Sequence, residues 1–323
     1  MKLLPTRMLD AARPGQIAAA AVCLRNGGLV AFPTETVYGL GADATSGPAV
    51  ARIYEAKGRP AFNPLIAHVP DLAQAQMFGD FSAAALALAE AFWPGPLTLV
   101  VPHRGGICDL ARAGLDSIGL RVPGSKVARQ LLALAGIPIA GPSANRSGHV
   151  SPVAAAHVLA DLGGRIDLIL DDGPCPVGVE STIVACLGGV PRLLRPGGIP
   201  VEAIEAVLGT PLEREAGRGI LAPGQLASHY APRARLRLNA RQVQAGETGV
   251  DFGGILRRAW PEAAILADLS PPGDLAEAAA NLFTCLRQLD HSGAARAAFA
   301  PVPATGLGAA INDRLARAAV GRP

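Results

Sequence analysis

The sequence is poor in lysine, in paired cysteine and in long apolar runs, and each shortage excludes a class of protein. Only three of the 29 basic residues among the 323 are lysines, and none of these follows a glycine, which excludes a Walker A phosphate loop. The five cysteines form no CxxC pair and the six histidines form no HxxxH pair, so neither a zinc site nor a disulfide framework is predicted. No apolar stretch reaches the roughly 18–20 residues of a membrane span, and the N-terminal residues lack a signal-peptide core. We therefore expect a soluble cytoplasmic protein that does not enter a membrane.

Two further signatures are missing, and the charge is nearly balanced. The glycines around Gly39 and Gly41 lack the third glycine of a GxGxxG dinucleotide loop, and the segment 141–145 lacks the closing glycine of a GxSxG hydrolase elbow. The 29 basic and 26 acidic residues give a net charge of +3, and residues 1–209 hold 16 of each sign. This balance argues against a protein built mainly to bind nucleic acid. A binder of double-stranded RNA or tRNA nevertheless stays open as the alternative to an enzyme.

The apolar pattern predicts an α/β protein in two parts. Short apolar runs alternate with helical segments over roughly the first 205 residues, as in the helix Gln16–Arg25 and the strand 29–32 that follows it. Such alternation is typical of an α/β domain with a largely buried sheet. We expect a catalytic domain over residues 1–209, a linker over 210–233 and a smaller α/β domain over 234–323. In this second domain, residues 254–256 are predicted to form a strand.

Loops that follow the predicted strands collect cations and hydroxyl groups. Lys57 and Arg59 come from a turn that we expect to be exposed, where they could clamp a polyphosphate or Lys57 could merely complement a helix C-terminus. Arg121 alternates with apolar residues inside a strand, which predicts either a buried ion pair or a ligand carboxylate. In the loop 141–152, hydroxyl groups precede a helix that Ser151 is expected to cap. Together these features predict an anionic substrate at the strand ends of one α/β domain.

Five motifs, in this order, resemble those of a known family: PTETVYGLG, KGRPAFNPL, GPSANRSG, GVESTI and LLRPG. The family is that of the YrdC-like threonylcarbamoyl-AMP synthases, and the resemblance covers most of residues 15–210. APGQLASHYAP and GLGAAINDRLARAA resemble the longer members, which carry an extra C-terminal domain. The resemblance implies an α/β fold: a twisted, mixed, open sheet with a basic groove, followed by a smaller Rossmann-like α/β domain on a long linker.

The resemblance also implies a reaction. L-threonine, bicarbonate and ATP would give L-threonylcarbamoyl-AMP and pyrophosphate, for threonylcarbamoyladenosine in tRNAs that read codons beginning with A. ATP would be a substrate, Mg²⁺ is expected to accompany it, and no dedicated metal site is predicted. Partner transferase machinery would carry the product to tRNA. A carbamoyl transferase acting on a protein is a weaker reading, because that class usually carries zinc-finger segments and this chain has no CxxC.

Individual residues receive roles from the same resemblance. L-threonine is expected against Thr36, His68, Arg121, Gly141 and Ser181, with Arg121 taking the carboxylate. ATP is expected against Arg59, Asn63, Ser117, Ser143, Ser151, Arg195 and Tyr230. The residues expected to be catalytic are Lys57, Arg59, Ser143 and Asn145. Tyr230 is further expected to fold back over the nucleotide, with the linker 210–233 acting as a lid.

Overall fold

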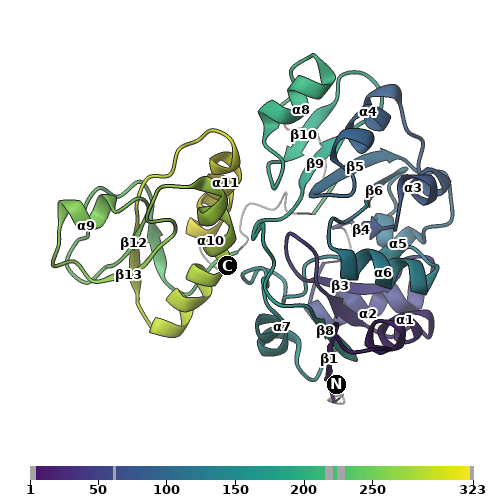
Figure 1. Cartoon of the computed structure of the whole chain (residues 1–323), viewed down its shortest axis with the longest axis horizontal. Coiled ribbons are helices and arrows are strands. Elements are labelled where there is room, and N and C mark those ends of the chain that lie inside the picture. The colour runs from purple at the N-terminus through teal and green to yellow at the C-terminus, as the bar shows by residue number, and fades with distance from the viewer. Residues whose placement is uncertain (1–4, 61–62, 215–220, 224–229, 321–323) are drawn as a thin grey trace. The chain divides into compact units, whose positions relative to one another are not determined.

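The chain forms two compact units in its computed structural model, which describes residues 5–60, 63–214, 221–223 and 230–320 (Figure 1). The first unit comprises Met1–Ser147, Pro152–Cys175 and Glu180–Gln225, and the second comprises Gly148–Ser151, Pro176–Val179 and Leu226–Pro323. The predicted boundaries 1–209, 210–233 and 234–323 stay predictions. Much of the predicted linker, including its Ser-His pair at 228–229, lies outside the described residues.

A ten-stranded mixed sheet is the framework of the first unit. Its strands are β1 (Arg7–Asp10), β2 (Val30–Phe32), β3 (Gly39–Asp43), β4 (Ile66–His68), β5 (Leu97–Pro102), β6 (Ser117–Arg121), β7 (Ile139–Ala140), β8 (Leu168–Asp171), β9 (Thr182–Ala185) and β10 (Arg192–Arg195). Their order is β1-β8-β2-β3-β7-β4-β6-β5-β9-β10. The pairs β1–β8, β2–β8, β4–β6 and β5–β9 are parallel and the remaining pairs are antiparallel. This is the mixed α/β sheet that the sequence predicts.

Over the described residues, eight helices accompany this sheet. They are α1 (Gln16–Arg25), α2 (Gly47–Lys57), α3 (Leu72–Phe78), α4 (Ala83–Phe92), α5 (Asp109–Arg112), α6 (Lys126–Ala135), α7 (Ala155–Leu162) and α8 (Val201–Leu208). Several of them, such as α1 and α6, pack apolar residues against the sheet. In one core cluster, Leu24 of α1 and Leu131 of α6 pack with Phe32 of β2, and all three are buried. Ser125 starts α6 by accepting a hydrogen bond from the backbone N–H of Ala128.

The second unit is built on a smaller parallel sheet. Its elements are β11 (Arg235–Arg237), β12 (Thr248–Asp251), α9 (Ile255–Ala259), β13 (Ile265–Asp268), α10 (Leu275–Ser292), β14 (Arg296–Phe299) and α11 (Leu307–Ala319). The strand order is β11-β14-β12-β13, and every pair is parallel. A parallel sheet with crossover helices confirms the predicted Rossmann-like α/β class.

Three local expectations are wrong, for identifiable reasons. The predicted strand 254–256 is the start of α9, because Gly253 and Gly254 have φ values of 61° and 68°, outside the strand region. Ser151 does not cap a helix, since α7 begins at Ala155 with Ala154 in the capping position.

The segment 32–41, which contains the motif PTETVYGLG, is expected to be a loop, yet its residues from Gly39 onward belong to β3. Gly39 and Gly41 weaken the sequence signal for this strand, because glycine has a low strand propensity. At Gly41 the packing is tight, since a Cβ there would lie 3.0 Å from Cγ2 of Ile139 and 3.1 Å from the Phe32 ring.

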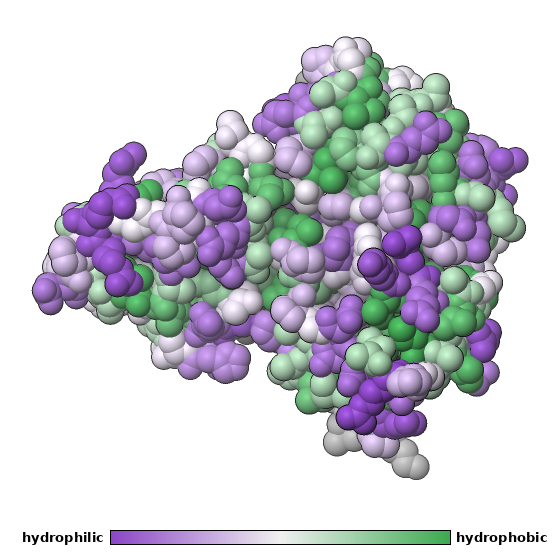
Figure 2. Space-filling view, viewed as in Figure 1, coloured by the Kyte–Doolittle hydropathy of each residue, from purple (hydrophilic) through white to green (hydrophobic). Residues whose placement is uncertain are grey.

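The surface seen in Figure 2 shows apolar residues in small groups among hydrophilic ones. Among the described residues, no helix combines the length and the apolar character that crossing a membrane requires.

Candidate active site

Lys57 lies at the C-terminus of α2 and is buried, which contradicts the expectation of an exposed turn. Its ammonium Nζ donates to the backbone carbonyls of Ser143, at 2.6 Å, and of Asn145, at 2.5 Å. The carbonyl of Lys57 in turn accepts from the N–H of Ser147. Burial lowers the pKa of Lys57 well below its usual value, and the charge of Arg59 lowers it further. Lys57 therefore holds the loop that carries Ser143 and Asn145.

Arg59 and Asn63 meet in the turn that follows α2. The guanidinium of Arg59 donates to the carbonyls of Asn63 and Pro64 at 3.1–3.3 Å. The hydroxyl of Tyr54 also donates to the Asn63 carbonyl, at 3.1 Å. The Asn63 side chain is buried, and its Oδ1 has no hydrogen-bond partner among the residues that the structure describes. A buried amide oxygen without a partner is suited to a ligand's donor group.

His68 ends β4 in a dry environment. Its ring is buried and meets the Phe32 ring edge-on, with 5.7 Å between the centroids. Burial, reinforced by the charge of Arg121, lowers the pKa of His68 to about 3, so the imidazole is neutral. Within the described part of the chain, its Nδ1 has no partner. A Cβ at Gly141 would lie 2.9 Å from this Nδ1, so a side chain there would crowd the imidazole.

Arg121 ends β6, the strand beside β4, and forms a buried ion pair. Its Nη2 donates to Oε1 of Glu35 at 2.6 Å and to Oγ1 of Thr36 at 3.0 Å. Its Nε donates to the carbonyl of Gly95 at 3.3 Å. Thr36 is fully buried and also hydrogen-bonds the hydroxyl of Thr34. Of the two roles predicted for Arg121, a buried ion pair or binding of a ligand carboxylate, the structure contains the ion pair. Its partner, Glu35, was not selected from the sequence as a site residue.

Ser181 and Arg195 form a third buried cluster. Arg195, the last residue of β10, donates through Nε and Nη2 to the carbonyl of Ser181 and through Nη2 to its hydroxyl. Arg195 Nη1 also donates to the carbonyl of Pro223, at 3.3 Å. The Ser181 hydroxyl lies 2.8 Å from that of Thr98, which is likewise buried. Thr98 is another residue that the motifs did not indicate.

Neighbouring strands bring these clusters together. His68 and Arg121 are register partners on β4 and β6. The N–H of Thr182 donates to the carbonyl of Pro96, which is adjacent to the Gly95 carbonyl bound by Arg121. Since Gly141 lies against the His68 ring, the structure gathers the five residues predicted for L-threonine around adjoining strand ends.

Three of the residues predicted for ATP belong to other parts of the fold. Ser117 begins β6, roughly 13 Å along the strand from Arg121 at about 3.3 Å per residue. Ser151 and Tyr230 belong to the second unit. There the buried Tyr230 ring stacks on Phe283, with centroids 5.3 Å apart, and the guanidinium of Arg314 lies 5.5 Å from its centroid.

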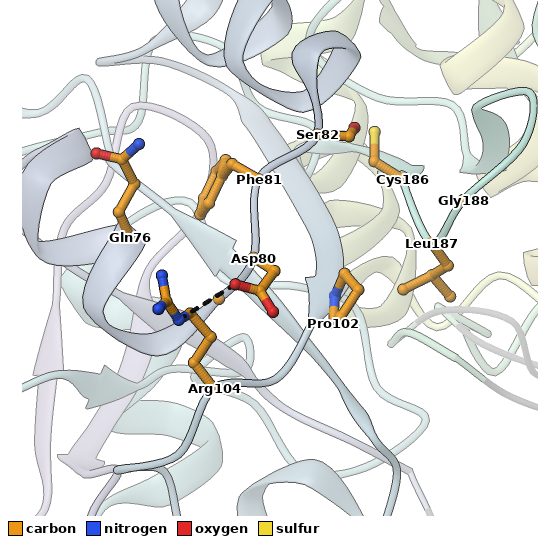
Figure 3. A pocket seen from close by; sticks show the side chains of 10 residues that line it. Gln76, Asp80, Phe81, Ser82, Pro102, Arg104, Cys186, Leu187 and Gly188 are labelled. Carbon is orange, nitrogen blue, oxygen red and sulfur yellow. Dashed lines mark ion pairs between the residues drawn. The ribbon is translucent and has the colours of Figure 1, made fainter.

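A hollow of about 470 Å³ in the first unit is lined by none of the predicted site residues. Figure 3 shows its wall, which includes Phe81, Cys186 and an ion pair between Asp80 and Arg104, with 3.1 Å between Oδ1 and Nε. The one acid and the one guanidinium of this wall bind each other.

Dedicated metal ligands are also lacking over the described ranges, where no three His, Cys, Asp or Glu side chains converge.

The first unit is thus a mixed α/β domain with a buried polar site at its strand ends, and two family models match the chain. The model described as "Telomere recombination", for Sua5, YciO and YrdC proteins, matches residues 22–197. The model described as "Threonylcarbamoyl-AMP synthase, C-terminal domain" matches residues 199–320. The chain belongs to the Sua5/YciO/YrdC family, and with both domains it is of the threonylcarbamoyl-AMP synthase type.

Named relatives and solved structures agree with this assignment. The threonylcarbamoyl-AMP synthase of Bacillus subtilis is 42% identical over 325 residues, covering 95% of this chain and 94% of the relative. That of Pyrococcus abyssi is 41% identical, covering 94% of each chain. A crystal structure of P. abyssi Sua5 complexed with L-threonine superposes with a TM-score of 0.89 at 37% identity, covering 98% of both chains. Escherichia coli YciO, at 23% identity and a TM-score of 0.53 over 61% of this chain and 96% of its own, shares the fold.

Function follows from this membership. The activity is that of a threonylcarbamoyl-AMP synthase, a nucleotidyl-transferring enzyme of tRNA modification. The alternative of a double-stranded RNA or tRNA binder is not favoured.

Proposed function

We propose that this chain makes L-threonylcarbamoyl-AMP from L-threonine, bicarbonate and ATP. The threonine amine and bicarbonate form a carbamate with loss of water. A carbamate oxygen then attacks the α-phosphorus of ATP, and the bond to the β-phosphate oxygen breaks, which releases pyrophosphate. The reaction needs no covalent enzyme intermediate, so catalysis consists mainly of positioning and charge neutralisation.

The unpartnered Nδ1 of His68 is the observation that carries the threonine assignment. This buried atom lies against Gly141, where a Cβ would approach it to 2.9 Å, and no residue that the structure describes bonds to it. Buried polar atoms normally have a partner. A neutral imidazole nitrogen makes one hydrogen bond, so it suits a substrate hydroxyl group. The match to a structure of P. abyssi Sua5 complexed with L-threonine supports L-threonine as the substrate.

The remaining contacts to L-threonine follow from the charges and hydroxyl groups of the site. Arg121 offers the cation for the carboxylate of the substrate. Thr36 and Ser181 offer buried hydroxyl groups, which accept from Arg121 and from Arg195, respectively. Gly141 is proposed to contact L-threonine through its backbone, because a Cβ there would meet Nδ1 of His68 at 2.9 Å.

ATP is proposed to bind next to this amino-acid site. The polar groups proposed for it in the first unit belong to Arg59, Asn63, Ser117, Ser143 and Arg195. The expected roles of Ser151 and Tyr230 in ATP binding stay predictions. The unpartnered Oδ1 of Asn63 supports its assignment. Lys57 and Asn145 act by shaping the Ser143 loop, since Lys57 is bound to the carbonyls of that loop.

Some requirements and partners lie beyond the protein's own site. Mg²⁺ is proposed to arrive on the phosphates of ATP, and no step is assigned to a protein-held metal. The product is proposed to pass through partner transferase machinery to tRNA, in the cytoplasm.

The direct test is pyrophosphate release by the purified chain with ATP, bicarbonate and L-threonine, with L-alanine and L-serine as controls. Labelled bicarbonate should enter a product that contains both threonine and AMP. Pyrophosphate release that is equal without any amino acid, or equal for alanine, contradicts the proposal.

A further inference from the structure

Glu35 is a nearly buried carboxylate in the loop between β2 and β3, and both of its oxygens are bonded. Its side chain is 12% exposed, and Oε1 accepts from Arg121 Nη2 at 2.6 Å. Oε2 accepts from the backbone N–H groups of Gly124, at 2.9 Å, and Ser125, at 3.3 Å. Glu35 thus connects its own loop, the end of β6 and the start of α6.

The start of α6 is a favourable place for this carboxylate. Ser125 is the N-cap of the helix, so the two N–H groups bound by Oε2 lie at its positive end. Gly124 allows the close approach, because a Cβ there would lie 3.3 Å from Cδ of Glu35. Charge-assisted bonds on both oxygens leave the carboxylate little freedom to rotate.

The consequence for Arg121 is that most of its donors are already used. Its Nε is bonded to the Gly95 carbonyl, and the two hydrogens of Nη2 serve Glu35 and Thr36. Nη1 makes no hydrogen bond to any residue that the structure describes. A substrate carboxylate therefore cannot form the usual bidentate pair with Arg121 unless it displaces Glu35 or Thr36.

We infer that Glu35 is a positioning residue of the amino-acid site, which holds the Arg121 guanidinium so that Nη1 alone is presented to the substrate carboxylate. The inference rests on the proposed function, because it assigns that carboxylate to Arg121. A guanidinium fixed through three of its bonds needs no further ordering when substrate arrives. Glu35 itself does not touch the substrate.

The decisive variant is Glu35→Gln, which keeps the size of the side chain and removes its charge. Its amide group cannot accept at both Arg121 and the Gly124 N–H, so the guanidinium loses its anchor. We expect the KM for L-threonine to rise about tenfold, as for loss of a hydrogen bond to a charged group, while the KM for ATP stays within about twofold.

Asp167→Asn is the matched control in the same unit. Asp167 also accepts from an arginine Nη2, that of Arg52 at 2.8 Å, and from a backbone N–H, that of Leu29 at 2.7 Å. It is not part of the proposed site. We expect this variant to lose comparable stability in urea unfolding but to keep the threonine KM of the wild type.

A second variant, Gly124→Ala, tests the same inference if Glu35→Gln does not fold. It crowds the Glu35 carboxylate without changing any charge. We expect a smaller rise in the KM for L-threonine and again no change for ATP.

The outcomes separate the inference from the proposed function. Wild-type chain that releases no threonine-dependent pyrophosphate rejects the proposed function, whatever the variants do. Active wild type with an unchanged threonine KM in folded Glu35→Gln or Gly124→Ala rejects the inference alone. Equal increases in the KM values for threonine and ATP also reject it, because they indicate a general structural role.

Discussion

Lys57 shows how burial changes the role of a single charged residue. As the last residue of α2 it has the sequence context of an exposed helix-ending cation, yet it is 3% exposed. Its two carbonyl partners are 86 and 88 residues away in sequence. No local sequence pattern could indicate contacts over such a separation. The sequence therefore identified Lys57 as a site residue but not its role in holding the 143–145 loop.

We expect Lys57→Met to destabilise the protein as well as to inactivate it. The substitution keeps an unbranched side chain, one atom shorter, but leaves two buried carbonyls without a donor, at about 1–3 kcal/mol each. Urea unfolding and pyrophosphate release measure the two effects. Lys126→Met, which changes the exposed lysine at the start of α6, is the matched control and should be neutral in both assays. A Lys57→Met protein as stable as the wild type contradicts the assigned role.

His68 makes the stability of the protein sensitive to acid. Its pKa is about 3 in the folded chain and about 6.5 when unfolded, so the unfolded chain binds the additional proton between these values. The free energy of unfolding should therefore decrease as the pH falls from 6.5 towards 3, by up to about 1.4 kcal/mol per pH unit.

The variant His68→Gln tests this dependence. Urea unfolding at several pH values from 7 to 4 should give a shallower decrease for His68→Gln than for the wild type. Equal slopes would show that another group causes the acid sensitivity.

At the scale of elements, close backbone approaches restrict particular loops. Gly197, which follows β10, has no room for a side chain: a Cβ would lie 2.3 Å from the carbonyl oxygen of Glu180 and 2.4 Å from the backbone N of Thr182. Both neighbours are backbone atoms, which cannot rotate away. The loop that carries Ser181 therefore depends on glycine at this position.

We expect Gly197→Ala to lower the free energy of unfolding by about 1–3 kcal/mol or more, as overpacking does. It should also reduce activity, because Arg195 and Ser181 are held by the same two segments. Thermal and urea unfolding measure the first effect, and pyrophosphate release measures the second. Gly47→Ala is the control, since a Cβ at Gly47 meets no atom within 4 Å. Similar stability of the two variants would refute the argument.

Elements were predictable where local signals agreed with burial. The helix Gln16–Arg25 is confirmed with its predicted bounds, because its apolar spacing and the Asn-Gly-Gly that follows specify both the helix and its end. The strand β3 was missed, because glycines required by close packing weaken the strand signal.

At the scale of the whole molecule, substrates should stabilise the folded chain by mass action. A ligand at 100 times its Kd adds about 2.7 kcal/mol to the free energy of unfolding. We expect L-threonine added with ATP to raise the melting temperature of the full chain further than ATP alone, and L-alanine to add little.

In the variant Gly141→Ala, L-threonine should no longer raise the melting temperature, because the added Cβ would crowd Nδ1 of His68 at 2.9 Å. ATP should still raise the melting temperature as it does in the wild type. Thermal shift assays measure both contributions. If L-threonine raises the melting temperature of this variant as much as that of the wild type, Gly141 and His68 are not part of the amino-acid site.

The sequence by itself determined the α/β class, the two-part organisation of its patterns and the residue types of the site. These depend on short-range periodicity, turn residues and ordered motifs, which are all properties of neighbouring residues. Only the tertiary structure decided that Lys57 is buried, that Glu35 binds Arg121 and that no described residue bonds to Nδ1 of His68. Each of these depends on the packing of segments far apart in sequence, since Glu35 and Arg121 are separated by 86 residues. Burial then determines whether a charged or polar group is solvated, paired or left available to a ligand.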